Sequence, residues 1–429
     1  MQLFIFSAII TLNIKLAERG VKMYIQRHAE KTASKLAEMF GAILIAGPRQ
    51  VGKTTMLEKL TDGITYVSLD DPIIKASAEE ESGTFFKDNP PPVFVDEIQK
   101  APALFNQIKL LLDRSHKKGQ FFMCGSQQFK MMKGVSESLA GRIGLCTLLG
   151  FSLRETHAVN CALPFIPTEE YFSARKQNLA DITYDEVWNT VQRGLMPELF
   201  INPNYSWQLY YSAYVRTYIE RDVRELSEIG DTVKFTNFMI AAAASTGQLV
   251  NVASLARDVG ISAPTAERWL SILVASNIVY LLQPYSNNVM KRAIKTPKLY
   301  FLDTGLAAYL TKWNSPEVLK TGAMAGAFFE SFVISEIIKS YYNAGISDPP
   351  IYFYRDKDMN EIDLLIENNG TLYPIEIKKH ADPQKSDAKA FKLIDSIPNV
   401  KKGQGGIVCL YDNLVTLTEG VKVIPIKYL

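Results

Sequence analysis

Short apolar runs alternate with segments of helical length between residues 41 and 148. The runs occupy residues 42–46, 65–69, 93–95, 121–124 and 143–148. Continuous apolar runs of this length, separated by helix-length segments, are typical of parallel strands buried on both faces. The pattern therefore predicts an α/β layer with a parallel sheet in this part of the chain.

The pattern changes after residue 157. Residues 158–233 are aromatic and helical, and residues 234–320 indicate small helices followed by a hairpin. From about residue 326 a helix leads into two strands, a helix at 385–397 and two closing strands. A length of 429 residues exceeds what one hydrophobic core usually holds. We expect an extension at 1–22, an α/β core at 23–157, a helical segment at 158–233 and two further domains at 234–320 and 321–429.

A phosphate-binding motif follows the first predicted strand. Residues 47–54 fit G-x-x-x-x-G-K-[ST] between a strand and a helix, which is the context the motif requires, whereas a chance match in a glycine-containing turn is the alternative. Backbone N–H groups and the helix N-terminus would face the phosphates, Lys53 would reach the β- and γ-phosphates, and Thr54 would offer its hydroxyl to Mg²⁺. The residues expected to bind ATP are Gly47, Pro48, Arg49, Gln50, Val51, Gly52, Lys53, Thr54 and Thr55.

Two acids end the third predicted strand. In P-loop ATPases the first acid holds Mg²⁺ and a following glutamate can polarise the attacking water, so we assign these roles to Asp96 and Glu97. An ordinary polar strand end is the alternative. The next strand ends at Gly125, after which Ser126 or Gln127 would sense the γ-phosphate, unless these residues form a simple turn.

Catalysis at such a site depends on charge stabilisation, so a further cation is expected. Arg142 is the candidate arginine finger, with Arg216, Arg221 and Arg224 as competitors. A finger acting on a neighbouring copy requires a homo-oligomer, commonly a ring. A surface ion pair is the simpler interpretation of each arginine taken singly.

Residues 252–273 are typical of two short helices joined by a turn. Gly260 would end the first helix and Ser262 would cap the second. The hairpin that follows would form a wing whose cations suit phosphate contact with DNA. These cations are Lys291, Arg292, Lys295 and Lys298. A structural or oligomerising role for this region is the alternative, because Glu267 on the expected reading face does not favour DNA.

Acidic residues gather in the predicted C-terminal domain. Asp363 lies on one strand, while Glu376 and Lys378 share a face of the next, because strand side chains alternate. With Glu330 on the preceding helix they resemble the PD-(D/E)XK nuclease core, which implies Mg²⁺ or Mn²⁺ at the acids and Lys378 near the attacking water. A solvated charged hairpin, or a nuclease-like fold that binds without cleaving, are the alternatives.

Composition narrows the class of protein. The net charge of +2 gives no overall field for nucleic acid or an anionic membrane, so any basic surface must be local. Four cysteines without a CxxC pair are typical of reduced thiols in a cytoplasmic protein. The apolar run at residues 3–10 is too short to span a bilayer, and Met23 is the expected start. No membrane-spanning segment is expected.

Six motifs occur in the order found in one protein family. They read GPRQVGKTT, VFVDEIQ, GSQQF, SLAGR, YVRTYIERDVR and LYFLDTGL. From about Tyr24 onwards the chain resembles bacterial and archaeal AAA-superfamily ATPases that carry a C-terminal domain of unknown function. The resemblance implies an ATPase core, a winged helix and a nuclease-like end domain, but no biological role.

The sequence thus favours an ATPase that drives or switches an activity on nucleic acid, with a metal-dependent nuclease site near the C-terminus. A regulatory NTPase whose terminal domains bind DNA or a protein partner, without cleaving anything, is the alternative.

Overall fold

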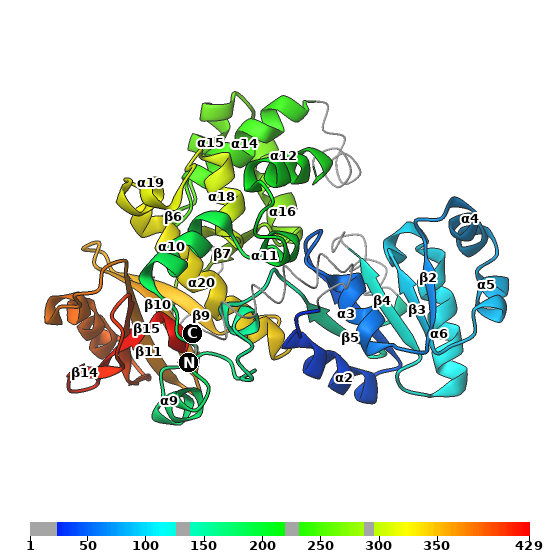
Figure 1. The fold of residues 1–429 in the computed structure, drawn as a ribbon, viewed down its shortest axis with the longest axis horizontal. Coiled ribbons are helices and arrows are strands. Elements are labelled where there is room, and N and C mark those ends of the chain that lie inside the picture. The colour runs from blue at the N-terminus through cyan, green and yellow to red at the C-terminus, as the bar shows by residue number, and fades with distance from the viewer. Residues whose placement is uncertain (1–23, 126–137, 219–230, 287–295) are drawn as a thin grey trace.

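The computed structural model describes residues 24–125, 138–218, 231–286 and 296–429 of the chain (Figure 1). A parallel sheet with its helices lies at one end of the molecule, coloured blue to cyan. A mixed sheet, coloured orange to red, lies at the other end, and helices occupy the space between and above them.

The parallel sheet confirms the predicted α/β layer. Its five strands follow the order β2-β3-β4-β1-β5, and every neighbouring pair is parallel. All residues of β1, β3 and β4 are buried, which explains their unbroken apolar runs. The strands are β1 (Ala42–Ala46), β2 (Thr65–Ser68), β3 (Val93–Asp96), β4 (Phe121–Gly125) and β5 (Ile143–Thr147).

Helices cover both faces of this sheet. Ile43 and Ile45 of β1 share a core with α2 (Ala29–Met39) and α3 (Lys53–Leu60). Leu44 points to the opposite face, because strand side chains alternate. That face is covered by α4 (Pro72–Glu80), α5 (Ser82–Asp88) and α6 (Ala103–Ser115). The loop from β1 to α3 therefore leaves the carboxyl end of a central strand.

Helices follow the parallel sheet. They are α8 (Leu153–Thr156), α9 (Glu169–Lys176), α10 (Tyr184–Arg193), α11 (Pro197–Ile201), α12 (Trp207–Tyr218) and α14 (Thr232–Ala244). None of the helices in the described ranges has the length and hydropathy needed to cross a bilayer.

The predicted pair of short helices is present as α15 (Val252–Val259) and α16 (Ala263–Ala275). Gly260 ends α15 in the left-handed conformation, and the Ser262 side chain caps α16 by accepting from Thr265 N–H. Both end signals are confirmed. A small antiparallel sheet accompanies them in the order β6-β8-β7. Its strands are β6 (Gln248–Leu249), β7 (Val279–Leu282) and β8 (Lys298–Phe301).

The mixed sheet has the main order β14-β15-β13-β11-β10-β9. The hairpin of β10 (Glu361–Asn368) and β11 (Thr371–Lys378) is the one expected from the sequence. Helix α20 (Ala325–Asn343) packs against one face, and the 3₁₀ helix η3 (Lys385–Ser396) against the other. The remaining elements are α18 (Thr304–Leu310), α19 (Pro316–Thr321), β9 (Ile351–Arg355), β12 (Lys401–Lys402), β13 (Gly405–Cys409), β14 (Val415–Thr418) and β15 (Val421–Pro425).

Candidate functional site

The loop between β1 and α3 has a backbone that favours glycine at two positions. Gly52 has φ of +87°, and a Cβ on Gly47 would lie 2.0 Å from the Leu148 carbonyl oxygen. Gln50 also adopts a positive φ, of 61°. The loop therefore curls tightly against the end of β5 and delivers Lys53 to the first turn of α3.

Lys53 is buried at the centre of this loop. Its Nζ donates to the carbonyl oxygens of Gly47 (3.0 Å) and Pro48 (2.7 Å). Burial lowers the pKa of the ammonium group. No carboxylate of the described residues lies within ion-pair distance of it. A buried cation with carbonyl partners and no counter-ion favours an anionic ligand, and the phosphates of a nucleotide have the matching charge.

The expected magnesium residues meet beside the loop. Thr54 Oγ1 donates to Asp96 Oδ2 over 3.0 Å, although the two residues lie 42 positions apart. Asp96 also accepts from the Tyr66 hydroxyl (3.2 Å), the Cys124 thiol (2.6 Å) and its neighbour Glu97 N–H (3.0 Å). The hydroxyl and carboxylate oxygens are ligands that Mg²⁺ prefers. Tyr66 and Cys124 hold the carboxylate and were not found from the sequence.

Glu97 follows in the left-handed region, with φ of 56°, and Gln99 Nε2 donates to its carboxylate. The Glu97 side chain lines a cavity of about 760 Å³ next to the loop. Arg49, Gln50, Val51, Gly52, Lys53, Thr54 and Thr55 line the same cavity. Seven of the nine expected ATP-binding residues therefore line this cavity together with Glu97, whereas Gly47 and Pro48 do not line it.

The remaining wall of the cavity comes from residues that the sequence did not connect with nucleotide binding. Tyr24, Phe151, Pro197, Ile201 and Tyr210 line it, together with Ile25, Arg27, Asp70, Glu198 and Thr217. Aromatic and aliphatic side chains suit the flat face of a nucleotide base. No local sequence pattern indicates this wall, because its residues come from the N-terminal segment, the loop after β2, the segment after β5, α11 and α12.

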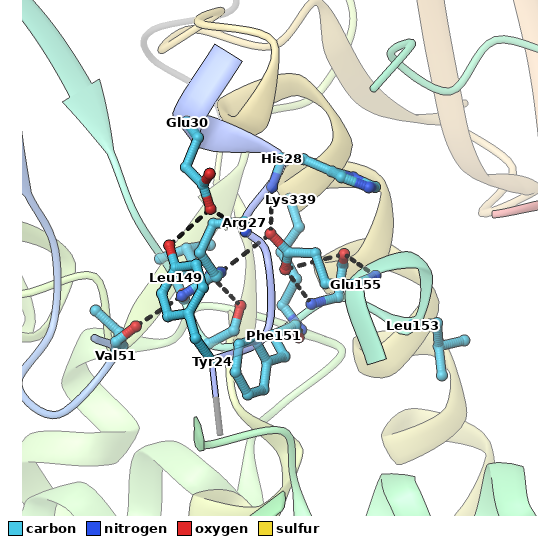
Figure 2. A network of polar contacts seen from close by, with 12 residues as sticks. Tyr24, Arg27, His28, Glu30, Val51, Leu149, Phe151, Leu153, Glu155 and Lys339 are labelled. Atoms are coloured by element: carbon cyan, nitrogen blue, oxygen red, sulfur yellow. Dashed lines mark hydrogen bonds and ion pairs between the residues drawn. The ribbon is translucent and has the colours of Figure 1, made fainter. Parts of the chain in front are cut away.

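Arg27 joins the loop to the segment after β5 (Figure 2). Its guanidinium donates to Val51 O and Leu149 O, both over 2.7 Å, and to Glu155 Oε1 over 3.1 Å. The ring of Phe151 lies 4.8 Å below it. Arg27 is 3% exposed and the Glu155 side chain 0%. Burial is the largest influence on Glu155 and opposes its ionisation, but Arg27, His28 and the backbone N–H groups of Ser152 and His28 together hold the pKa of the carboxyl below its usual value.

A second buried ion pair continues this network into the C-terminal half. Lys339 on α20 donates to Phe151 O (2.8 Å) and to Glu336 (2.7 Å), and Glu336 accepts from Leu153 N–H (2.7 Å). Both side chains are nearly inaccessible, at 6% and 1% exposed. The phosphate loop is thus connected to α20 through Arg27 and the segment around Phe151 (Figure 2).

The candidate arginine finger lies away from this cavity. Ala42 N–H, at the start of β1, donates to Arg142 O, and the Arg142 side chain pairs with Asp113 over 2.5 Å. The phosphate loop leaves the other end of β1, and each strand residue adds roughly 3.3 Å. Arg142 therefore cannot contact phosphates held by its own chain. Arg216 lies on α12 beside Thr217, which lines the cavity. Ser126, Gln127, Arg221 and Arg224 lie outside the described residues.

The C-terminal acids surround a lysine. Lys298 on β8 lies 3.2 Å from Glu330 on α20 and 2.5 Å from Glu361 on β10, and its side chain is 6% exposed. Burial lowers the pKa of Lys298, but the carboxylates of Glu330, Glu361 and Asp363 together outweigh it and raise the pKa above its usual value. Tyr300 also donates to Glu330. The sequence predicted that Lys298 would contact phosphate from the wing. This prediction is wrong, because Lys298 is buried between acidic side chains. Lys291, Arg292 and Lys295 fall outside the described ranges.

Asp363 and Glu376 lie beside this group. A shift in register between Ile362 and Leu365 marks the site of Asp363, whose Oδ2 accepts from Ile377 N–H (2.9 Å). Glu376 Oε1 accepts from Lys378 (2.7 Å), while its Oε2 is buried with no hydrogen-bond partner among the described residues. Burial, followed by the negative charge of Asp363, raises the pKa of Glu376. The structure thus brings Asp363, Glu376 and Lys378 together as predicted from the sequence.

These acids do not form a three-carboxylate ligand set. In the described part of the chain, no three His, Cys, Asp or Glu side chains are placed so that they could hold one metal ion. Glu330 is instead neutralised by Lys298. Asp363 and Glu376 have the oxygen donors that Mg²⁺ or Mn²⁺ prefers, and the unpartnered Glu376 Oε2 fits such an ion.

The parallel sheet and the loop define a P-loop ATPase. Residues 40–157 match the family model of an AAA domain, and residues 325–429 match a domain of unknown function, DUF4143. Residues 184–317 match a second domain of unknown function, DUF8612. The chain therefore contains an AAA-type P-loop ATPase domain and a C-terminal DUF4143 domain. The fold class predicted from the sequence is confirmed.

Two curated relatives are similar to most of the chain. They are the uncharacterized proteins Rv2008c of Mycobacterium tuberculosis and Mb2031c of Mycobacterium bovis. Each is 28% identical over 364 residues, which cover 82% of this chain and 74% of the relative.

Several solved ATPases show weaker similarity. A Walker-type ATPase of Pyrococcus abyssi is 14% identical with a TM-score of 0.42, covering 68% of this chain and 97% of that one. A Holliday junction branch migration motor of Thermotoga maritima is 16% identical with a TM-score of 0.27, and the match covers 59% of this chain and 85% of that one.

Proposed function

We propose that this chain hydrolyses Mg-ATP at the loop between β1 and α3 and uses the reaction to drive or switch an activity on nucleic acid. The observation that carries the first part is that Lys53 and Thr54 line a cavity of about 760 Å³ and that Thr54 is hydrogen-bonded to Asp96. Bound Mg²⁺ would neutralise charge that develops on the phosphates. Thr54 and Asp96 would hold it, Lys53 would bind the phosphates, and Glu97 would orient the attacking water.

An arginine finger would then come from a second copy of the chain. Arg142 lies at the end of the sheet opposite its own phosphate loop, and its side chain is partly exposed. A homo-oligomer, such as a ring, would bring Arg142 to the γ-phosphate of a neighbour. Arg216 is the competitor within the same chain.

The nucleic-acid-directed part rests on the two C-terminal modules. The elements follow the order α14, β6, α15, α16, β7 and β8, which is the order of a winged helix. The elements α20, β9, β10, β11, η3 and β13 have the order of a PD-(D/E)XK core, with β11 antiparallel to β10 and parallel to β13. Asp363 and Glu376 would hold the metal, and Lys378 would lie near the attacking water.

A non-cleaving regulatory NTPase is the second candidate, and one observation favours it. Lys298 pairs with both Glu330 and Glu361, so Glu330, one of the expected metal ligands, is already engaged inside the chain. In this alternative the end domain would bind DNA or a protein partner without hydrolysing it.

Nicking of supercoiled DNA separates the two candidates. The chain would be incubated with Mn²⁺ or Mg²⁺, with and without ATP, beside Asp363→Ala and Glu376→Gln. Cleavage lost in both variants supports a nuclease site at these residues. Nicking that persists in Asp363→Ala removes this site from consideration, and no cleavage under any condition favours the regulatory NTPase.

A further inference from the structure

A basic cleft lies beside the C-terminal acids. It has a volume of about 600 Å³ and runs between η3 and the turns before β13 and β15. Four lysines and one acid, Glu419, are the charged residues that line it. The lysines are Lys385, Lys389, Lys392 and Lys402.

Three of these lysines have ammonium groups without a counter-ion. Lys402 pairs with Asp395 over 2.7 Å. Lys385, Lys389 and Lys392 are exposed, and within the described ranges no ion pair or hydrogen bond engages their side chains. The backbone of η3 that carries these lysines is held in place, because Phe391 and Ile394 of η3 are buried against the mixed sheet. A rigid row of unpaired cations is a site for a polyanion.

The cleft adjoins a second cavity, which is lined by Glu376. That neighbouring cavity has a volume of about 430 Å³ and includes Glu376 and Lys378, and Lys389 lines both cavities. Pro374, Glu376 and Lys378 project from the same face of β11, because they alternate along the strand, and Pro374 lines the basic cleft. A polyanion in the cleft would therefore extend directly towards the Glu376 carboxylate.

We infer that this cleft binds the sugar-phosphate backbone of a nucleic acid strand and directs it to Glu376. The inference rests on the proposed function, since it names the residues that hold that substrate. The repeating phosphates of such a strand match the charge of a row of lysines that leads to Glu376. Apart from Phe391, Pro374 and Val421 the lining is polar, glycine or alanine, so the cleft offers little to a lipid chain.

The test is equilibrium binding of fluorescein-labelled single-stranded and duplex oligonucleotides to the full chain in EDTA, where no metal-dependent cleavage occurs. Lys385→Gln, Lys389→Gln and Lys392→Gln are combined in one variant. If each lysine neutralises one phosphate, the slope of log K against log salt falls by about 2.7 for duplex and about 2.1 for single strands. The matched control combines Lys87→Gln, Lys117→Gln and Lys118→Gln, three exposed lysines of the AAA domain, and should bind as the wild type does.

Three results would overturn the inference. The first is a cleft variant that binds with the affinity and the salt slope of the wild type. The second is a wild type that binds neither oligonucleotide at low salt. The third is displacement of the oligonucleotide by polyglutamate as effectively as by unlabelled DNA, which would indicate an acidic protein partner. Thermal unfolding verifies that the surface variants remain folded. If the cleft variant binds more weakly but the wild type cleaves no DNA, the binding cleft is supported and the proposed nuclease activity is excluded. If the wild type cleaves DNA but the cleft variant binds as tightly as the wild type, the nuclease activity is supported and the binding cleft is excluded.

Discussion

At the scale of single residues, the candidate sites consist of charges that are buried or held by few partners. Lys53 is 7% exposed and contacts only backbone carbonyls among the described residues, and Asp96 accepts from Thr54, Tyr66 and Cys124. Glu376 has one oxygen without a partner in the described structure. Side chains in such environments respond to ligands and protons, so substitutions here have defined consequences.

Thr54→Val should reduce the affinity for Mg-ATP about tenfold or more, because it removes a hydroxyl that contacts Asp96 and would bind Mg²⁺. Binding of ATP without Mg²⁺ should change little. Thr54→Ser retains the hydroxyl and serves as the control. Calorimetric titration in Mg²⁺ and in EDTA measures both effects, and an equal loss in the two conditions would contradict the assigned role.

Glu376 should make stability depend on pH. Burial raises the pKa of its carboxyl in the folded chain to about 8, against about 4.3 when unfolded. The folded state therefore binds this proton more tightly, and the resulting stability, present below about pH 4.3, is lost as pH rises through the folded pKa. Urea unfolding between about pH 5 and pH 9 should show a fall on the order of 1 to 3 kcal/mol that Glu376→Gln lacks. The same dependence of unfolding free energy on pH in the wild type and in Glu376→Gln would contradict the raised pKa of Glu376.

At the scale of elements, the sequence predicted those strands and helix ends that are determined by neighbouring residues in the chain. All five strands of the parallel sheet lie where apolar runs were found, and the caps of α15 and α16 lie at Gly260 and Ser262. Two-residue strands such as β6 and β12 have no periodicity and were not predicted. The Arg27–Glu155 pair spans 128 positions and follows from tertiary packing alone. Lys298 was misplaced for the same reason, because only the fold surrounds it with acids.

Arg27→Met should destabilise the chain by roughly 3 to 5 kcal/mol, because it leaves Glu155 buried without its cation. Adding Glu155→Gln should recover part of this loss. The control is Lys31→Met, since Lys31 reaches Asn160 at an exposed position. Urea unfolding of the four proteins measures the effect. Equal midpoints for Arg27→Met and Lys31→Met would show that the buried pair contributes little.

At the scale of the whole molecule, helix α20 belongs to both candidate sites. Glu336 and Lys339 contact the segment that Arg27 ties to the phosphate loop, and Glu330 contacts Lys298 beside the C-terminal acids. Lys298 itself comes from the sheet that accompanies α15 and α16. These contacts give a continuous physical connection between the modules, through which nucleotide binding could bias the acid site.

Lys298→Met should raise the affinity of the end domain for Mn²⁺ by about tenfold or more, because it removes the cation that pairs with Glu330 and leaves Glu361 with only Arg355, 3.7 Å away. Lys422→Met is the control, since Lys422 lies in the end domain but pairs with the exposed Glu169 of α9. Electron paramagnetic resonance of free Mn²⁺ during titration measures the binding. Unchanged affinity would mean that Lys298 does not oppose the metal.

The central claim is that the loop between β1 and α3 binds and hydrolyses ATP, and phosphate release by the purified chain tests it most directly. Turnover in Mg²⁺ should fall by about 10²-fold or more in Lys53→Ala and in Glu97→Gln. Lys59→Ala, on an exposed position of the same helix α3, should retain wild-type turnover. Turnover that survives in Lys53→Ala at the wild-type rate would contradict the account.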